Sequence, residues 1–255
     1  MKHQLYRFYH TKKTMLLLIV LIGIPMIEII QLIHLQSVSD ITFHPTFAFF
    51  LSGMSRGHAS QTILLWFLPI YFLIMFSDDS IQDYETGTRV VLIARVGLKK
   101  YLQEKLFYSF FAASFIMTIS LGINFILVHL FFFYGDYKNG LDEMVFSDNW
   151  LFTMSMEHHY IGVFIFIFFA ISMAGFAGLL GASMSLFFKD RKYAYPATFF
   201  IWFAFLLREN SLMFVFQPFT EYGLEVIVPI YLIVSLFIIV LSVGTYWNER
   251  RMDEI

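Results

Sequence analysis

The sequence predicts an all-α integral membrane protein that forms a single transmembrane domain over residues 1–255. Of its 255 residues, 58% are hydrophobic and only 14% are charged, whereas soluble domains carry roughly 25% charged residues. Phe alone occurs 33 times, a content that suits helices facing lipid and would cause aggregation in water. The chain has no cysteine, which excludes disulfides and thiolate metal sites.

Six apolar segments are candidates for membrane-spanning helices, each of which needs about 20 mostly apolar residues. They are Thr14–Leu35, Gln61–Phe76, Leu106–Tyr134, Tyr160–Phe188, Tyr193–Leu207 and Leu224–Trp247, of which the second and fifth are short. Before the sixth segment, the aromatic stretch SLMFVFQPFTEYG is interrupted by Pro218. A full span would not tolerate this break, so we expect a re-entrant or interfacial hairpin there.

The basic residues predict the orientation of these spans. Of the 17 Lys and Arg residues, 14 lie on one side of the six predicted spans and three on the other. Cytoplasmic loops carry an excess of basic residues, so we expect a multi-pass protein of the cell membrane with both termini in the cytoplasm. The N-terminal stretch KHQLYRFYHTKK spaces Leu5, Phe8 and Tyr9 about one turn apart, which is typical of a helix lying flat among lipid headgroups.

A charged island, Ser77–Lys105, separates the second and third predicted spans. It holds 10 charged residues of both signs within 29 positions. Ser80 and Asp83 have the spacing of a capping pair that starts a helix, and Gly87 permits a turn before the half-apolar stretch RVVLIARV. A simple connection needs only a handful of residues, so we expect a cytoplasmic helix here that docks on a partner.

The island resembles the cytoplasmic coupling region of permeases in the ABC type-2 exporter family. The shared pattern is an acid, Gly-Thr, an apolar turn, a basic-aromatic turn and a lysine. It is seen here as Glu85, Gly87-Thr88, Val90–Ile93, Lys99-Lys100-Tyr101 and Lys105, with Val96-Gly97 where family members often have a proline. The six spans, the basic amphipathic N-terminus and the broken aromatic hairpin also fit this resemblance.

The resemblance implies an ATP-driven exporter built from two permease subunits, identical or homologous, and two separate ABC ATPase subunits that bind ATP and Mg²⁺. The residues it assigns to contact with the ATPase are Asp83, Tyr84, Glu85, Thr86, Gly87, Thr88, Arg89 and Arg95. The chain itself lacks a phosphate-binding Gly-Lys-Ser/Thr loop, because none of its 14 glycines precedes a lysine. We therefore expect no enzymatic activity and no cofactor in this chain, and no nucleic-acid partner.

The substrate is predicted only as a class. The connection between the third and fourth spans is acidic, with Asp136, Asp142, Glu143, Asp148 and Glu157 against one lysine. Such a surface attracts cations or cationic peptides, although an ordinary solvated loop has the same composition. Together with the Phe-rich spans, it favours an amphipathic or peptide-like substrate, in peptide export or in immunity to membrane-active peptides.

Several polar and small residues lie inside the predicted spans. A carboxylate near mid-membrane costs about 2.5–3.5 kcal/mol, so Glu28 is expected to face protein or water. Two interpretations stay open: a translocation pathway formed with Gln31 and Asn124, or buried packing groups, since Asn commonly links helices by hydrogen bonds. In SMAGFAGLLGASMS, Gly175, Gly178 and Gly181 recur every three residues and predict a tight helix–helix contact.

Other function classes fit less well. An intramembrane hydrolase using Ser183 needs an activating base, and the last histidine, His159, lies 24 residues away, about 36 Å along a helix. Zinc binding by His58, Glu157, His158 and His159 lacks an HExxH spacing, and we assign no metal site. A secondary transporter usually has more acidic groups in its spans. A non-transporting sensor or immunity protein that sequesters a peptide remains an alternative.

Overall fold

The computed structural model describes residues 2–39, 41–53, 58–138, 140–141 and 149–253, and nearly all of them are helical. The elements are α1 (Lys2–His10), α2 (Lys12–Ser39), α3 (Pro45–Ala48), the 3₁₀ turn η1 (Phe50–Ser52), α4 (Ala59–Trp66), α5 (Leu68–Phe72), the π-helical turn η3 (Leu73–Ser77), α6 (Asp78–Glu85), α7 (Thr88–Val96), α8 (Leu98–Phe131), α9 (Trp150–Glu157), α10 (His159–Phe188), α11 (Arg191–Leu206), the 3₁₀ turn η5 (Leu212–Phe216) and α12 (Leu224–Asp253). In the described ranges, β-structure is limited to one bridge between Phe43 and Tyr137.

Four helices, α2, α8, α10 and α12, are long and apolar enough to cross a membrane. A fifth candidate is α4 together with the helical run 68–85, which is bent by 50° at the break between them. The predicted fifth span is α11, which has only 16 residues. At about 1.5 Å per residue it is ~24 Å long, shorter than the ~30 Å hydrocarbon core. The described chain therefore has four or five helices of spanning length.

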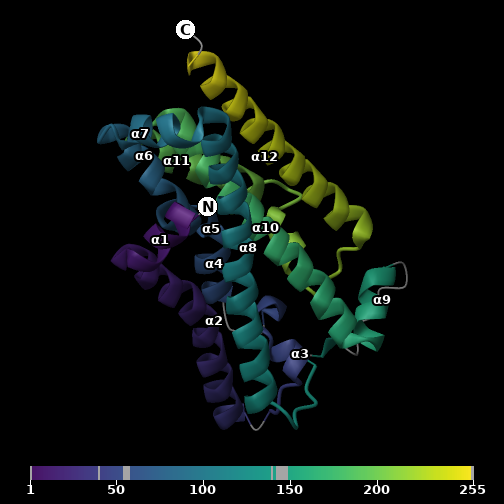
Figure 1. The fold of residues 1–255 in the computed structure, drawn as a ribbon. Helices are drawn as coiled ribbons and strands as arrows, with labels where there is room; N and C mark the ends of the chain where they lie inside the picture. Colours follow the sequence, from purple (N-terminus) through teal and green to yellow (C-terminus); the bar gives the residue numbers. More distant parts are fainter. Residues whose placement is uncertain (1, 40, 54–57, 139, 142–148, 254–255) are drawn as a thin grey trace.

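Helix α10 lies at the centre of the bundle and packs against α8, α11 and α12 (Figure 1). The three predicted packing glycines lie on its buried face. A Cβ atom on Gly178 would lie 2.5 Å from the Ser109 carbonyl oxygen of α8, and one on Gly181 would lie 3.0 Å from Leu73 Cβ of η3. Gly175 faces the Phe110 ring of α8, where a Cβ would come within 2.7 Å of Cε2. These close contacts are all within one chain.

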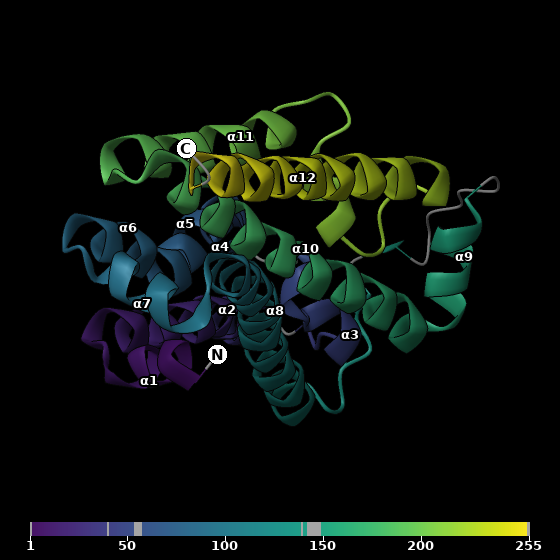
Figure 2. The ribbon, with the colours of Figure 1, turned by 45° about the horizontal axis from the view of Figure 1, so that its top comes forward.

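The helices α1, α6 and α7 gather with the C-terminal turns of α12 at one end of the molecule, which we call the charged end (Figures 1 and 2). Helices α3 and α9 lie at the opposite end. The breaks on either side of α7 occur at Gly87 (φ +72°) and Gly97 (φ +81°), a backbone region that glycine enters without steric cost. The half-apolar helix predicted after Gly87 is therefore present as α7.

The predicted capping pair Ser80–Asp83 is wrong. The helix continues from η3 directly into α6, and no side-chain cap starts α6. Ser80 and Asp83 are instead both buried on α6. A helix passing through this point without a new start has no free N–H groups for a cap to satisfy.

Two irregular segments carry buried aromatic and apolar side chains. The first, residues 41–53, includes α3 and η1, and its side chains Phe43, Phe47 and Phe50 are almost completely buried. The second, residues 207–223, is exposed over 207–210 but includes η5, which is largely buried and packs against α10 and α12. The two segments meet where the rings of Phe47 and Phe219 stack with a centroid separation of 4.4 Å. The proline at 218 predicts the irregular backbone of the second segment, whereas no pattern in the sequence indicates that the first is buried.

Candidate functional site

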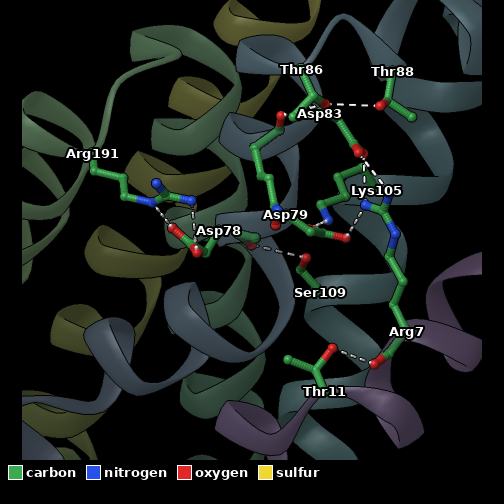
Figure 3. Close-up of polar contacts among 12 residues, drawn as sticks. Arg7, Thr11, Asp78, Asp79, Asp83, Thr86, Thr88, Lys105, Ser109 and Arg191 are labelled. Carbon is green, nitrogen blue, oxygen red and sulfur yellow. Dashed lines mark hydrogen bonds and ion pairs between the residues drawn. The ribbon is translucent and has the colours of Figure 1, made fainter.

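Three carboxylates on α6 form the core of the charged end. Asp79 and Asp83 are four residues apart and share one face of the helix. Asp78, the first residue of α6, points to an adjacent face. Asp78 and Asp83 are both buried. Buried carboxylates require charged or hydrogen-bonding partners, and helices α1, α8 and α11 supply them (Figure 3).

Helices α1 and α8 supply the partners of Asp79 and Asp83. Arg7 of α1 donates two hydrogen bonds to Asp83, of 2.8 Å from Nη1 and 2.7 Å from Nη2, and Nη1 lies 3.4 Å from Asp79. Burial lowers the pKa of Arg7, but the hydrogen bonds and negative charges of Asp83 and Asp79 outweigh it and leave that pKa raised. Lys105 of α8 is buried and forms an ion pair with Asp79. The amphipathic N-terminal helix α1 is thus fixed to α6 through the contacts of Arg7 with Asp83 and Asp79.

Helix α11 holds the remaining carboxylate. Arg191, in its first turn, donates to Asp78 from Nε at 2.6 Å and from Nη2 at 3.3 Å, and lies 3.5 Å from Glu85. The Tyr195 hydroxyl donates a further 3.0 Å hydrogen bond to Asp78. The hydrogen bond to Asp78 is the main reason that the pKa of Arg191 is raised, despite opposing burial. Asp78 therefore links the end of the bent helix to α11.

Helix α7 is held by the ends of α10 and α12. Arg89 forms an ion pair with Glu249 of α12, and the Lys189 Nζ lies 2.9 Å from the other Glu249 oxygen. Glu249 is only 2% exposed, so the two cations neutralise a charge that would otherwise be costly to bury. The ring of Tyr84 lies beneath both cations, 5.8 Å from Arg89 Cζ and 5.4 Å from Lys189 Nζ.

A small apolar cluster supports the inner face of α7. Its buried members are Tyr101, Leu102 and Leu186. Leu92 and Ile93 of α7 pack against them, together with Leu98, Leu106 and Tyr246. Apolar packing on one side and an ion pair at its start therefore fix α7 to the bundle.

The opposite side of this element is open, and we call it the α7 outer face. It consists of the exposed residues Gly87, Val90, Val91, Ala94, Arg95 and Val96. Val90 and Val91 have relative exposures of 71% and 52%, although they lie at the end of the bundle that carries most of its charged contacts. Exposed apolar residues grouped on one helix face are typical of a protein–protein contact.

The residues predicted to couple to an ATPase differ in how far the chain itself engages them. Asp83 and Arg89 are engaged by Arg7 and Glu249 and are not available to a partner. Tyr84 and Glu85 are exposed, but they also contact Lys189 and Arg191. Gly87 and Arg95 lie on the α7 outer face. Thr88 is partly buried and shares a 2.8 Å hydrogen bond with Thr86. Hydropathy and spacing located the element but could not show which side of it faces the bundle.

The predicted pathway residues differ in burial. Glu28 and Asn124 are fully buried, whereas Gln31 is exposed. The Asn124 Nδ2 donates a 3.0 Å hydrogen bond to the Pro25 carbonyl, and its Oδ1 accepts a 3.1 Å bond from the Phe50 backbone N–H. Asn124 thereby joins α2 to the buried segment 41–53.

Gln61, which is not among the predicted site residues, is fully buried on α4. Its Nε2 donates to the backbone carbonyls of Phe50 at 2.6 Å and Leu51 at 2.9 Å. Buried backbone polar groups require hydrogen-bond partners, and Gln61 and Asn124 supply them for η1. The sequence feature that points to Gln61 is its position as a polar amide at the start of the apolar run 61–76.

The groups considered for catalysis and metal binding are placed elsewhere. The Ser183 hydroxyl donates a 2.8 Å hydrogen bond to the Ser242 hydroxyl. A serine hydroxyl cannot act as the general base that a nucleophilic Ser183 would need. Within the described part of the chain, no three His, Asp or Glu side chains lie close enough together to hold a metal ion. The rings of His44 and His159 are tilted by 33° with centroids 5.2 Å apart, and both meet the Phe47 ring edge to face.

Comparison with known proteins gives one extensive relationship. No protein-family model and no solved structure matches the chain. The "Uncharacterized protein YybM" of Bacillus subtilis (strain 168) is 51% identical over 245 residues, which cover 96% of both chains. Identity at this level over nearly the whole length shows a common family, and the chain belongs to the family of YybM.

Proposed function

We propose that this chain is the transmembrane permease subunit of an ATP-driven exporter in the cell membrane, and that a separate ATPase docks on the α7 outer face. The observation that carries this proposal is the two-sided character of α6–α7. One side is fixed to the bundle by Asp78, Asp83 and Arg89, while the other exposes Val90 and Val91. A helix that is both held firmly and open on one face suits the transfer of motion from a partner.

The contacts of α6–α7 suggest how such motion would spread. Displacement of α7 would act on α12 through Arg89–Glu249 and on α8 through the break at Gly97. Displacement of α6 would act on α1 through Arg7 and on α11 through Arg191. Coupling between distant sites requires a contiguous set of packed and ion-paired elements, and α6–α7 contacts elements from both halves of the chain.

The proposed topology has six crossings, with the charged end in the cytoplasm. α4 and residues 68–77 form the second crossing, and α11 together with segment 207–223 forms the fifth. The excess of basic residues at the charged end supports this orientation. The subunit would pair with a second permease chain, identical or homologous, and the partner ATPases would supply the sites for ATP and Mg²⁺.

The proposed substrate is amphipathic or peptide-like. Buried polar groups inside the bundle, Glu28 and Asn124, are the candidates for a pathway that accepts polar atoms. Of the acidic residues that predict attraction of cationic peptides, Asp142, Glu143 and Asp148 lie outside the described residues. Export of such a peptide, or immunity to it, is the form of this function that we favour.

Co-purification of the tagged full-length chain from a Bacillus host in mild detergent tests this proposal. We expect a chain with a Gly-Lys-Ser/Thr phosphate loop to co-purify and to hydrolyse ATP. Val91→Asp should lower its recovery by roughly tenfold or more, because an unpaired charge buried in an interface costs about 2 kcal/mol or more. Tyr134→Asp, which changes a residue 92% exposed beyond the far end of α8, is the matched control.

Two outcomes would contradict the proposal. One is recovery of the same ATPase with the Val91→Asp variant at the level of the Tyr134→Asp control. The other is transport by the purified chain without a nucleotide-hydrolysing partner. Substitution of Arg89 is a poor test, because Arg89 neutralises the buried Glu249 and its loss would disturb folding.

A further inference from the structure

An apolar groove of about 370 Å³ runs between α8 and α12 in the half of the bundle nearer the charged end. Phe107, Phe110 and Phe111 form its wall on α8, Ile239 and Val243 form its wall on α12, and Leu179 of α10 lies between them. Its volume falls within the range of about 300–1,000 Å³ that is usual for ligand sites. The groove is open to the side, since Phe107 and Phe111 are exposed.

Each wall of the groove continues into basic residues toward the charged end. On α12, Ile239, Val243 and Tyr246 line the groove, and Arg250 follows Tyr246 by four residues on the same helix face. On α8, Gln103 lies at the same end of the groove, and Lys99 precedes it by four residues. Arg250 and Lys99 do not line the groove themselves but lie about one helical turn beyond its lining residues, and we call these two cations its cationic rim.

Arg250 is held at this rim by aromatic contacts. Its Cζ lies 5.9 Å from the ring centroids of both Tyr246 and Trp247, within the range of cation–π attraction. The acidic neighbour Glu249 is buried and neutralised by Arg89 and Lys189. The positive charge of Arg250 is thus not cancelled by the residue beside it.

We propose that this groove is a binding site for one anionic phospholipid from the leaflet at the charged end. Its acyl chain lies between α8 and α12, and its phosphate is attracted by Arg250 and Lys99. Apolar contact alone does not select a ligand here, because lipid tails are as apolar as the groove walls. Selectivity comes from the charge complementarity of the rim, and a bound lipid is retained because the groove and its cationic rim are adjacent.

The site is connected to α7 but does not depend on the proposed export function. Leu106 and Tyr246 line the groove and also pack against the apolar cluster beneath α7. A lipid in the groove therefore touches two of the residues that support α7. This link gives the lipid a route to influence the α7 outer face.

Native mass spectrometry of the full-length chain, titrated in detergent with phosphatidylglycerol and with phosphatidylcholine of the same acyl chains, tests the proposal. We expect one phosphatidylglycerol to bind preferentially. Arg250→Gln should reduce this preference by about fivefold, which corresponds to the loss of one basic residue near a phosphate. Arg251→Gln, which changes an exposed neighbour, should leave the preference unchanged.

Filling the groove provides a second measurement that does not change charge. Val243→Trp places a bulky ring among the acyl-chain contacts and should reduce lipid retention by roughly tenfold. The control is Val240→Trp, because Val240 is exposed on the same helix but does not line the groove. Both valines are exposed, so neither substitution overfills a buried core.

Three results would overturn the proposal. The first is equal binding of the two lipids by the unsubstituted chain. The second is a Val243→Trp variant that retains phosphatidylglycerol as well as the Val240→Trp control. The third is efficient disulfide cross-linking of two chains through Val243→Cys, which is readily interpreted because the chain has no cysteine of its own. That result would show that a second copy covers the groove.

Discussion

The Ser120 hydroxyl of α8 donates a 2.7 Å hydrogen bond to the Leu21 carbonyl of α2. Leu21 lies four residues before Pro25, and proline has no N–H to satisfy that carbonyl within the helix. The contact therefore replaces a helical hydrogen bond with one between helices. Proline is tolerated in membrane helices where neighbouring polar groups provide such replacements.

Ser120→Ala should consequently destabilise the protein by about 1–2 kcal/mol, since it leaves the Leu21 carbonyl without a partner in a buried site. The measurement is the unfolding free energy in SDS-containing mixed micelles. Ser185→Ala is the matched control, because the Ser185 hydroxyl is equally buried but bonds only to a carbonyl of its own helix, that of Ala182. Equal destabilisation by the two substitutions would contradict the role assigned to Ser120.

The contact between α1 and α6 can be tested by a double-mutant cycle. Arg7→Gln leaves the buried Asp83 without its bidentate partner and should cost about 2–3 kcal/mol of unfolding free energy. Combining it with Asp83→Asn should recover part of this loss, because the pair then no longer contains an uncompensated charge. Lys13→Gln, at an exposed position next to α1, serves as control. Additive effects of the Arg7 and Asp83 substitutions would exclude direct coupling.

The close approach of α10 to α8 makes a sharp prediction for glycine. Gly178→Ala places a Cβ 2.5 Å from the Ser109 carbonyl oxygen, and backbone cannot move aside cheaply. We expect a loss of about 1–3 kcal/mol from overpacking. Gly122→Ala on α8, where a Cβ meets nothing within 4 Å, should be neutral or stabilising because alanine favours helix. The same unfolding measurement decides between these outcomes, and a harmless Gly178→Ala would show that the two helices pack less closely.

Single cysteines can establish the proposed orientation, because the natural chain has none. Cysteine at Val90 should react with a membrane-impermeant maleimide only in inverted vesicles or broken cells. Cysteine at Tyr134 should react in intact cells, and cysteine at the buried Phe47 should react in neither until the protein is denatured. Labelling of the Val90 position from outside intact cells would refute the proposed function, since no cytoplasmic ATPase could then reach α7.

The long helices and the breaks around α7 were predictable because their causes are local. Apolar runs of sufficient length produced α2, α8, α10 and α12, and glycine permitted the positive φ angles at Gly87 and Gly97. The apolar runs predict six spans, whereas the described chain has four or five helices of spanning length, because α11 is short and α4–α6 is bent. A hydropathy profile gives the length of an apolar run, but it does not show how the resulting helix is tilted or where it bends.

The sequence by itself determined that this chain forms apolar helices with a charged, half-apolar element between two of them. Only the tertiary structure decided that Asp83 pairs with Arg7, 76 residues away, and that Arg89 pairs with Glu249, 160 residues away. It also decided that segment 41–53 is buried and held by Gln61 and Asn124. The physical reason is that the formation of a helix depends on neighbours within a few turns, whereas the partner of a buried charge depends on which helices pack together.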